Sequence, residues 1–263
     1  MGYGFIWDID GVVMDSPHEA AWRETASKPP WSVSLSTDFY LRHVASRPRY
    51  EGAHNILLLQ GVYDKLGAKT EEERKRLLER FATEKNNMIR DLIRRGKFKI
   101  FRDAVTLLLR AKRVEIPQAC ASASKNATDM LRMVDRERIL REMGTDYGVL
   151  SPGQTLYDVF DVDACGLDLG GKTGILRHAA DQLRAKFPEA EFFVVFEDSP
   201  SGLAAAKSLG FYAVGVHRIG SVEALRDAGA DIIVDRLDEL NPESLLREIE
   251  AKNRESNTNP TEP

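Results

Sequence analysis

The chain has 263 residues, of which 43% are hydrophobic and 30% charged, a composition typical of a globular protein with a full core. Its 37 basic and 41 acidic side chains leave a net charge of −4, so the charge balance does not favour nucleic acid as a partner. The early sequence has no basic region followed by a long apolar stretch, and no membrane span is visible. We therefore expect a cytoplasmic protein with no membrane or nucleic acid partner, built as two domains or as one with an insertion.

The two cysteines, Cys120 and Cys165, lie far apart in the sequence and belong to no CxxC or Cys/His motif. A chain with so few cysteines has no disulfide framework, and the spacing matches no zinc motif. We expect both to be buried, reduced thiols.

The stretch 5–16, FIWDIDGVVMDS, begins with an apolar run that predicts a buried strand ending near Gly11. Alternation of side chains along a strand would place Asp8 and Asp10 on the same side, close enough to share a cation. The alternative is a polar strand end with an Asx turn into the glycine.

The next segment, 16–96, is helical in pattern. HEAAWRETASK has helical spacing and ends at the pair Pro29-Pro30, and from Thr37 to about Arg95 no strand-like alternation occurs. A wholly helical stretch directly after the first strand indicates an inserted helical cap.

Past Gly96, strand and helix patterns alternate. The predicted strands are QACASAS, YDVFDVDAC, FFVVFED, YAVGVH and DIIVD. Repeated strand–helix units with apolar strands predict an α/β fold, a doubly wound, Rossmann-like parallel sheet covered by helices on both faces. We expect the core to comprise 1–15 and 97–250, the cap 16–96, and a disordered tail 251–263, whose residues lack apolar periodicity.

Polar side chains stand at the ends of the predicted strands. They are Asp8, Asp10, Ser122, Glu197 and Asp198, with Lys172 at a Gly-rich turn that opens a helix. Each has a local explanation as a helix cap, a turn residue or a solvated charge, but together they would meet at one edge of the sheet. Acids, a lysine and a hydroxyl fit phosphoryl transfer. Asp8 and Asp198 could hold Mg²⁺, a carboxylate could attack phosphorus, and Ser122, the amides that follow it and Lys172 could hold the phosphate.

These motifs carry a family resemblance. DIDGVV, a strand ending in Ser122, then Lys172, then EDSPSG resemble, in order and spacing, the four motifs of the haloacid dehalogenase superfamily over most of residues 1–235. Within it the chain looks most like the β-phosphoglucomutase-like branch, whose helical cap follows the first motif. The shared features are the run ASASKN at 121–126, the pair His18 and Trp22, Arg49 in RPRYEG, and the pair Lys85 and Asn86.

The resemblance implies a role for each matching residue. Asp8 would be the nucleophile and a magnesium ligand, and Asp10 the general acid and base, with its carbonyl also on magnesium. Ser122 and Lys172 would hold the phosphate, while Asp198 would complete the protein ligands of Mg²⁺ with Glu197 in support. The remaining implied roles belong to substrate binding: Ser124, Lys125 and Asn126 around phosphate and sugar, Arg49 on a distal phosphate or sugar oxygens, and His18 and Lys85 coupling cap closure to Asp10.

Local alternatives remain for two of the cap residues, because His18 could simply pack on Trp22 and Arg49 could be a surface charge. The chain also departs from the branch where Thr173 replaces the usual proline after Lys172, and in a shorter linker before His18. The segment 143–158 has no assigned role.

The resemblance implies magnesium-dependent transfer of a phosphoryl group from a phosphorylated sugar through an aspartyl phosphate. We favour a sugar phosphatase. A β-phosphoglucomutase-type mutase and a non-catalytic phosphosugar-binding protein are the alternatives. Neither the sugar nor the oligomeric state follows from the sequence.

Overall fold

The structure is a computed structural model that describes residues 2–45, 47–247 and 249–250, so the predicted tail at 251–263 lies outside the described residues. The chain divides into two compact units. One runs to Asp15 and resumes at Lys99, and the other is Ser16–Phe98, so the second boundary falls at Phe98 where the sequence suggested residue 96. Among the described residues no helix combines the length and the apolar character needed to cross a membrane.

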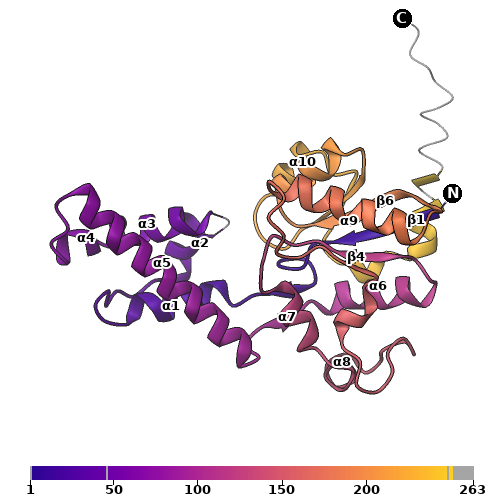
Figure 1. Ribbon diagram of the computed structural model, residues 1–263, viewed down its shortest axis with the longest axis horizontal. Coiled ribbons are helices and arrows are strands. Elements are labelled where there is room, and N and C mark those ends of the chain that lie inside the picture. The colour runs from indigo at the N-terminus through magenta and orange to yellow at the C-terminus, as the bar shows by residue number, and fades with distance from the viewer. Residues whose placement is uncertain (1, 46, 248, 251–263) are drawn as a thin grey trace, which may run out of the picture. The chain divides into compact units, whose positions relative to one another are not determined.

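The first unit is built on a six-stranded parallel sheet in the order β5-β4-β1-β6-β7-β8 (Figure 1). The strands are β1 (Gly2–Trp7), β4 (Gln118–Cys120), β5 (Val162–Asp163), β6 (Ala190–Glu197), β7 (Tyr212–Val216) and β8 (Ile232–Val234). A short antiparallel ribbon of β2 (Met14–Asp15) and β3 (Lys99–Ile100) joins the two segments that lead to the second unit.

Helices cover both faces of this sheet, with α9 and α10 on one face and α6 on the other (Figure 1). The helices are α6 (Arg102–Arg113), α7 (Ala127–Arg132), α8 (Arg136–Met143), α9 (Lys172–Lys186), α10 (Pro200–Ser208) and α11 (Val222–Asp227), with 3-10 turns η1 (Leu156–Val159) and η2 (Leu237–Glu239). The predicted doubly wound, Rossmann-like α/β fold is thereby confirmed.

Two predicted strands are shorter in the structure. Only Gln118–Cys120 of QACASAS is a strand. YDVFDVDAC covers residues 157–165, of which the first three belong to η1 (Leu156–Val159) and only Val162–Asp163 pair with the sheet. The 3-10 turn η1 has a local cause. The Asp158 carboxylate accepts a hydrogen bond from the N–H of Thr155 (2.7 Å), a capping contact that favours the start of a helix.

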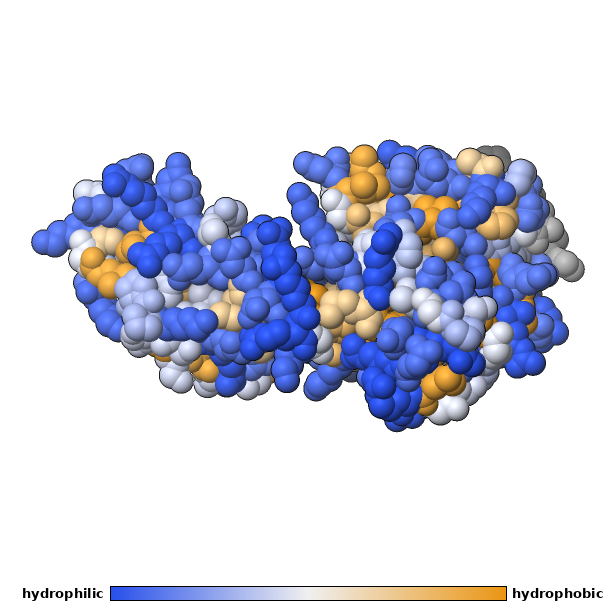
Figure 2. Space-filling view, turned by 60° about the horizontal axis from the view of Figure 1, so that its bottom comes forward, coloured by the Kyte–Doolittle hydropathy of each residue, from blue (hydrophilic) through white to orange (hydrophobic). Residues whose placement is uncertain are grey.

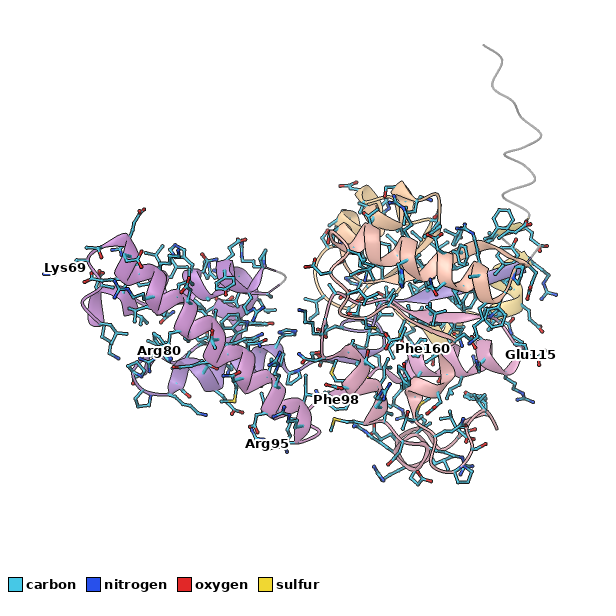
Figure 3. All side chains as sticks on the ribbon, viewed as in Figure 1. Lys69, Arg80, Arg95, Phe98, Glu115 and Phe160 are labelled. Carbon is cyan, nitrogen blue, oxygen red and sulfur yellow. The ribbon has the colours of Figure 1, made fainter. Side chains whose placement is uncertain are left out.

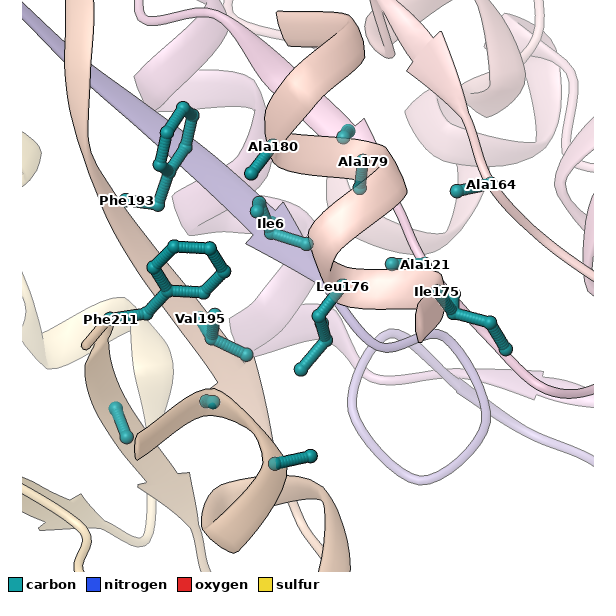
Figure 4. Close-up of a cluster of buried hydrophobic side chains, with 14 of the residues drawn as sticks. Ile6, Ala121, Ala164, Ile175, Leu176, Ala179, Ala180, Phe193, Val195 and Phe211 are labelled. Carbon is teal, nitrogen blue, oxygen red and sulfur yellow. The ribbon is translucent and has the colours of Figure 1, made fainter. Parts of the chain in front are cut away.

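The side chains of β1 are buried on both faces of the sheet. Ile6 faces α9, whose Leu176, Ala179 and Ala180 lie in the same cluster (Figure 4). On the other face Trp7 stacks on Phe196 with ring centroids 4.0 Å apart. The strand that leads to Asp8 is therefore held rigidly from both sides.

A hydrogen-bonded chain adds to this rigidity. The indole N–H of Trp7 donates to Gln118 Oε1 (2.9 Å), and Gln118 Nε2 donates to the Leu108 carbonyl on α6 (3.1 Å). Because these polar atoms are buried, leaving one of them unpaired would cost about 1–3 kcal/mol.

The second unit is helical throughout, as predicted. Its helices are α1 (His18–Ser27), α2 (Thr37–His43), α3 (Arg49–Leu59), α4 (Val62–Lys65) and α5 (Glu71–Arg94). A separate core contains Trp22, Trp31 and Phe81. The longest helix, α5, lies between Lys69 and Arg95 in Figure 3 and starts with a capping box of Thr70 and Glu73. The viewed faces of both units are mainly hydrophilic (Figure 2).

Candidate active site

Carboxylate and hydroxyl side chains meet at the carboxyl edge of the central strands. Asp8 follows β1, Ser122 lies two residues after β4, and Glu197 ends β6 with Asp198 next. Since β4 and β6 both flank β1 in the sheet, parallel pairing brings these residues to one place. The predicted convergence at this edge is thus present in the structure.

Lys172 lies at the centre of this group. Its Nζ donates to Asp8 Oδ1 (2.6 Å) and to the Ala121 carbonyl (3.0 Å), and it forms an ion pair with Glu197 Oε2 (2.8 Å). Lys172 is the first residue of α9 and follows Gly171, whose φ of 98° suits glycine. One amine thereby links the ends of β1, β4 and β6.

Burial dominates the electrostatics of the cluster. It raises the pKa of Asp8 to about 7, with Lys172 opposing the rise and Glu197 adding to it. It also raises the pKa of Asp198 to about 8, assisted by repulsion from Glu197 and then Asp8. Burial tends to lower the pKa of Lys172, but Asp8 and Glu197 outweigh it and raise that pKa, so the amine stays charged.

The acidic cluster fits a divalent cation. Asp8, Glu197 and Asp198 each offer one carboxylate oxygen, and these oxygens lie within 4.8 Å of one another. Three ionised carboxylates against one ammonium leave two negative charges, which a doubly charged ion would balance. An all-oxygen donor set suits a hard ion such as Mg²⁺. Asp8 and Asp198 would bind it, because both oxygens of Glu197 are engaged, Oε2 by Lys172 and Oε1 by Ser199, whereas Lys172 contacts only Oδ1 of Asp8.

Glu197 is fixed by the start of α10, a support that the sequence reasoning missed. Its Oε1 accepts from the N–H (3.1 Å) and the hydroxyl (2.8 Å) of Ser199, the N-cap residue of that helix. A Cβ on Gly202 would overlap the Glu197 carboxyl group. The N-cap pattern of serine followed by proline, directly after the acidic pair, could have indicated this arrangement.

Asp10 lies outside the strand. Because β1 ends at Trp7, the predicted strand does not extend to Asp10, and alternation along it is not what positions Asp8 and Asp10. Asp10 is still close enough for its charge to raise the pKa of both Asp8 and Asp198. Asp10 instead belongs to a tight turn in which the Gly11 N–H donates to the Met14 carbonyl (2.8 Å). This is closer to the turn alternative considered for the sequence.

Gly11 is a further residue whose importance the sequence reasoning missed. Its φ is 97°, and a Cβ there would overlap the Asp198 carboxylate. The turn after β1 therefore lies against one of the acids of the cluster, which requires both a positive φ and the absence of a side chain.

We expect Gly11→Ala to weaken magnesium binding by about tenfold, or about 1.4 kcal/mol, because the new Cβ would displace the Asp198 carboxylate. Gly210→Ala is the matched control, because Gly210 also has a positive φ (74°) but nothing lies within 4 Å of its Cβ position. Magnesium titrations by calorimetry compare the two. Equal loss of affinity in both variants would mean that backbone strain, not contact with Asp198, is responsible.

The loop after β4 contains the remaining predicted phosphate contacts. Ser122 is buried, and its Oγ accepts from the Ser124 N–H (3.2 Å), while Ser124 Oγ accepts from the Asn126 N–H (3.3 Å). Two of the amides expected to face a phosphate are therefore engaged within the loop. Lys125 is exposed and Asn126 is half-buried.

In the second unit, His18 and Lys85 are in direct contact. Lys85 is buried, its Nζ lies 2.8 Å from His18 Nδ1, and it stands 4.8 Å from the centroid of the Trp22 ring. An ammonium can only donate, so His18 Nδ1 accepts and its other ring nitrogen carries the proton when the ring is neutral. Arg49 is exposed at the start of α3. The contact of Lys85 with both His18 and the Trp22 ring shows how these side chains pack, and a role of His18 in cap closure stays a prediction.

The segment 143–158 is anchored to its own unit. Asp146 is buried and accepts from Arg136 Nε (2.6 Å) on α8, and Arg110 on α6 stands 5.5 Å from the Tyr147 ring centroid. These contacts give the segment a structural role. Thr173 is the second residue of α9, and the first four N–H groups of a helix have no hydrogen-bond partner within it. Threonine in place of the usual proline therefore changes no hydrogen bond within the helix.

The comparison with protein families agrees with the geometry. A model of haloacid dehalogenase-like hydrolases matches residues 4–210. The chain belongs to this family. The roles that the resemblance implies for the strand-end acids and Lys172 stay predictions.

The similar proteins are β-phosphoglucomutase-like. An archaeal β-phosphoglucomutase from Pyrococcus has 36% sequence identity and a TM-score of 0.78, with 95% of this chain and 99% of that chain covered. A phosphorylated carbohydrates phosphatase from Thermotoga maritima is 26% identical over 93% of this chain and 98% of its own length. A β-phosphoglucomutase from Bacillus subtilis is 27% identical over 93% and 94%.

Proposed function

We propose that the protein is a magnesium-dependent phosphatase of phosphorylated sugars, acting through an aspartyl phosphate on Asp8. The observation that carries this proposal is the contact of Lys172 with both Asp8 and Glu197, beside Asp198. A carboxylate nucleophile next to a fixed positive charge is suited to attack on a phosphate monoester. We also propose a cytoplasmic location, as the composition suggests.

In this mechanism Asp8 attacks phosphorus while the bond to the sugar oxygen breaks, and Asp10 gives that oxygen a proton. Water then attacks the phosphoryl group, Asp10 takes its proton, and Asp8 is released with inorganic phosphate. Lys172 contacts Asp8 Oδ1, so we assign Oδ2 as the attacking oxygen. Ser122 and Lys172 hold the phosphate oxygens. Bound Mg²⁺ would supply positive charge that offsets the repulsion between nucleophile and phosphate.

A sugar substrate is supported by the names of the relatives, which act on phosphorylated carbohydrates or on phosphoglucose. Arg49, exposed at the start of α3, is the residue we assign to the distal part of the substrate. Ser124, Lys125 and Asn126 would contact phosphate and sugar from the loop after β4.

A mutase is the second candidate, and two observations favour it. The solved structure with 36% identity is a β-phosphoglucomutase. The buried Lys85 also orients His18 within the second unit, and the resemblance implies that these two residues couple cap closure to Asp10. A non-catalytic phosphosugar-binding protein is the third reading, and the intact contact between Asp8 and Lys172 argues against it.

One experiment separates these functions. The protein is incubated with a panel of sugar phosphates, including β-glucose 1-phosphate with a trace of bisphosphate primer, with and without Mg²⁺. The proposal predicts release of inorganic phosphate from sugar phosphates only when Mg²⁺ is present. Accumulation of glucose 6-phosphate without free phosphate would establish the mutase instead. If no substrate is turned over, the remaining hypothesis is the non-catalytic phosphosugar-binding protein.

The raised pKa values predict how pH affects the metal-free protein. The pKa values of Asp8 and Asp198 are about 7 and 8 in the folded protein but near 3.8 in the unfolded chain. As the pH rises, the unfolded chain therefore loses these two protons at a lower pH than the folded protein. The contribution of these two carboxyl groups to folding stability is therefore largest below about pH 4 and is lost as the pH rises through 7–8. Mg²⁺ binds the ionised acids, so its stabilising effect should grow from pH 6 to pH 9.

Thermal unfolding at several pH values, with and without Mg²⁺, measures this effect. A magnesium-induced rise in melting temperature that is the same at pH 6 and pH 9 would contradict the assignment of Asp8 and Asp198 as the ligands. EDTA-treated protein serves as the metal-free reference.

A further inference from the structure

A second group of metal-ligating side chains lies at the edge of the same sheet. Strand β5 pairs with β4 so that Asp163 is opposite Cys120, and Cys165 follows two residues later. The sulfurs of Cys120 and Cys165 and a carboxylate oxygen of Asp163 lie within 4.8 Å of one another. The two cysteines are thus far apart only in the sequence, and the reasoning from spacing that excluded a zinc site missed their contact.

The carboxylate of this cysteine cluster (Cys120, Asp163 and Cys165) is oriented from two sides. Its Oδ1 accepts from the Cys165 N–H (2.9 Å) and from Cys120 Sγ (3.4 Å). Its Oδ2 accepts from Thr128 Oγ1 (2.9 Å) on α7. Outer contacts of this kind fix a ligand in place and are typical of protein metal sites.

Charge and access both favour a cation at the cysteine cluster. Among the ion pairs of the described residues none involves Asp163, whereas Asp161, two residues before it, pairs with Lys112 (2.8 Å). Cys120 is buried, while Cys165 and Asp163 are half-buried and keep part of their surface in contact with solvent. A cation can therefore reach the cluster at Cys165 and Asp163.

We propose that the cysteine cluster is a binding site for a thiolate-preferring divalent cation, with Zn²⁺ as the best match, separate from the magnesium site at Asp8. Two sulfurs bound to one zinc at about 2.3 Å in a tetrahedron are about 3.8 Å apart, which the spacing of the cluster accommodates. On binding, each thiol releases its proton to solvent and no electron is transferred. Asp163 is the third ligand and water the fourth.

Ligand chemistry keeps the two sites distinct. Mg²⁺ prefers the all-oxygen cluster of Asp8, Glu197 and Asp198, while thiolates select zinc over magnesium. The Gly166 N–H donates to the Ser122 carbonyl (2.8 Å). The proposed zinc ligand Cys165 therefore directly precedes a residue that contacts the loop after β4. A bound ion would join the end of β4 to the loop that leads to Lys172.

The test is a titration of the intact, reduced protein with Co²⁺ and Zn²⁺ in excess Mg²⁺. We expect one equivalent of Co²⁺ to give intense thiolate-to-cobalt absorption that Zn²⁺ abolishes. Competition with a chromophoric chelator should show zinc affinity falling about 100-fold or more in Cys165→Ser and about tenfold in Thr128→Val, which removes only the outer contact. Asp168→Asn, an exposed acid on the same loop, is the matched control and should bind like the wild type.

Two results would overturn the proposal. One is a cobalt complex without thiolate absorption, which would place the ion on the carboxylates alone. The other is a zinc affinity that is unchanged in Cys165→Ser. Circular dichroism of each variant verifies that the fold is retained, and magnesium-dependent turnover reports separately on the site at Asp8.

Discussion

Asp8→Asn should reduce turnover of sugar phosphates by about 10⁴-fold or more, since removing a nucleophile eliminates the covalent step. The fold should survive. Lys172 keeps its contacts with Glu197 (2.8 Å) and the Ala121 carbonyl (3.0 Å), and the amide does not have to be ionised in a buried position. Steady-state release of phosphate and thermal unfolding measure the two effects.

Detection of the covalent intermediate tests the mechanism directly. Acid-quenched wild-type protein should contain a phosphorylated Asp8 by mass spectrometry, and the Asn variant should not. Asp181→Asn, which changes an exposed carboxylate on α9, should retain full turnover and the phosphorylated species. Turnover by Asp8→Asn near the wild-type rate would reject the mechanism.

Lys172→Met should have the second largest effect. Without the amine, Asp8 and Glu197 are two buried acids with no positive partner, and the phosphate loses its fixed charge. We expect turnover to fall about 10³-fold. Stability at pH 8 should fall by about 3 kcal/mol, the cost of breaking a buried ion pair.

The destabilisation of Lys172→Met should be smaller at pH 6, where Asp8, with a pKa of about 7, can take up a proton. Added Mg²⁺ should restore part of the stability at pH 8, because it supplies positive charge to the same acids. Urea unfolding at both pH values measures this. Lys186→Met, at the other end of α9, is the matched control and should change neither quantity. Equal destabilisation by the two variants would show that the charge of Lys172 does not matter.

Much of the site followed from local patterns in the sequence. The apolar run before Asp8 and the run FFVVFE before Asp198 both form strands, and both acids stand at the strand ends as predicted. The predicted length of this strand was wrong, because a strand's end depends on its pairing partners and β1 stops pairing at Trp7. A pattern of alternation gives no information about where that pairing ends.

The fold class and the helical second unit were determined by the sequence alone, because hydrophobic periodicity and helix capping act over a few residues. Only the tertiary structure decided which distant groups touch. Lys172 contacts Asp8 across 164 positions, Ser199 and Gly202 fix Glu197, and Cys120 meets Cys165 through the pairing of β4 with β5. Such contacts depend on the order of strands in the sheet, which the chain acquires only when the whole core packs together.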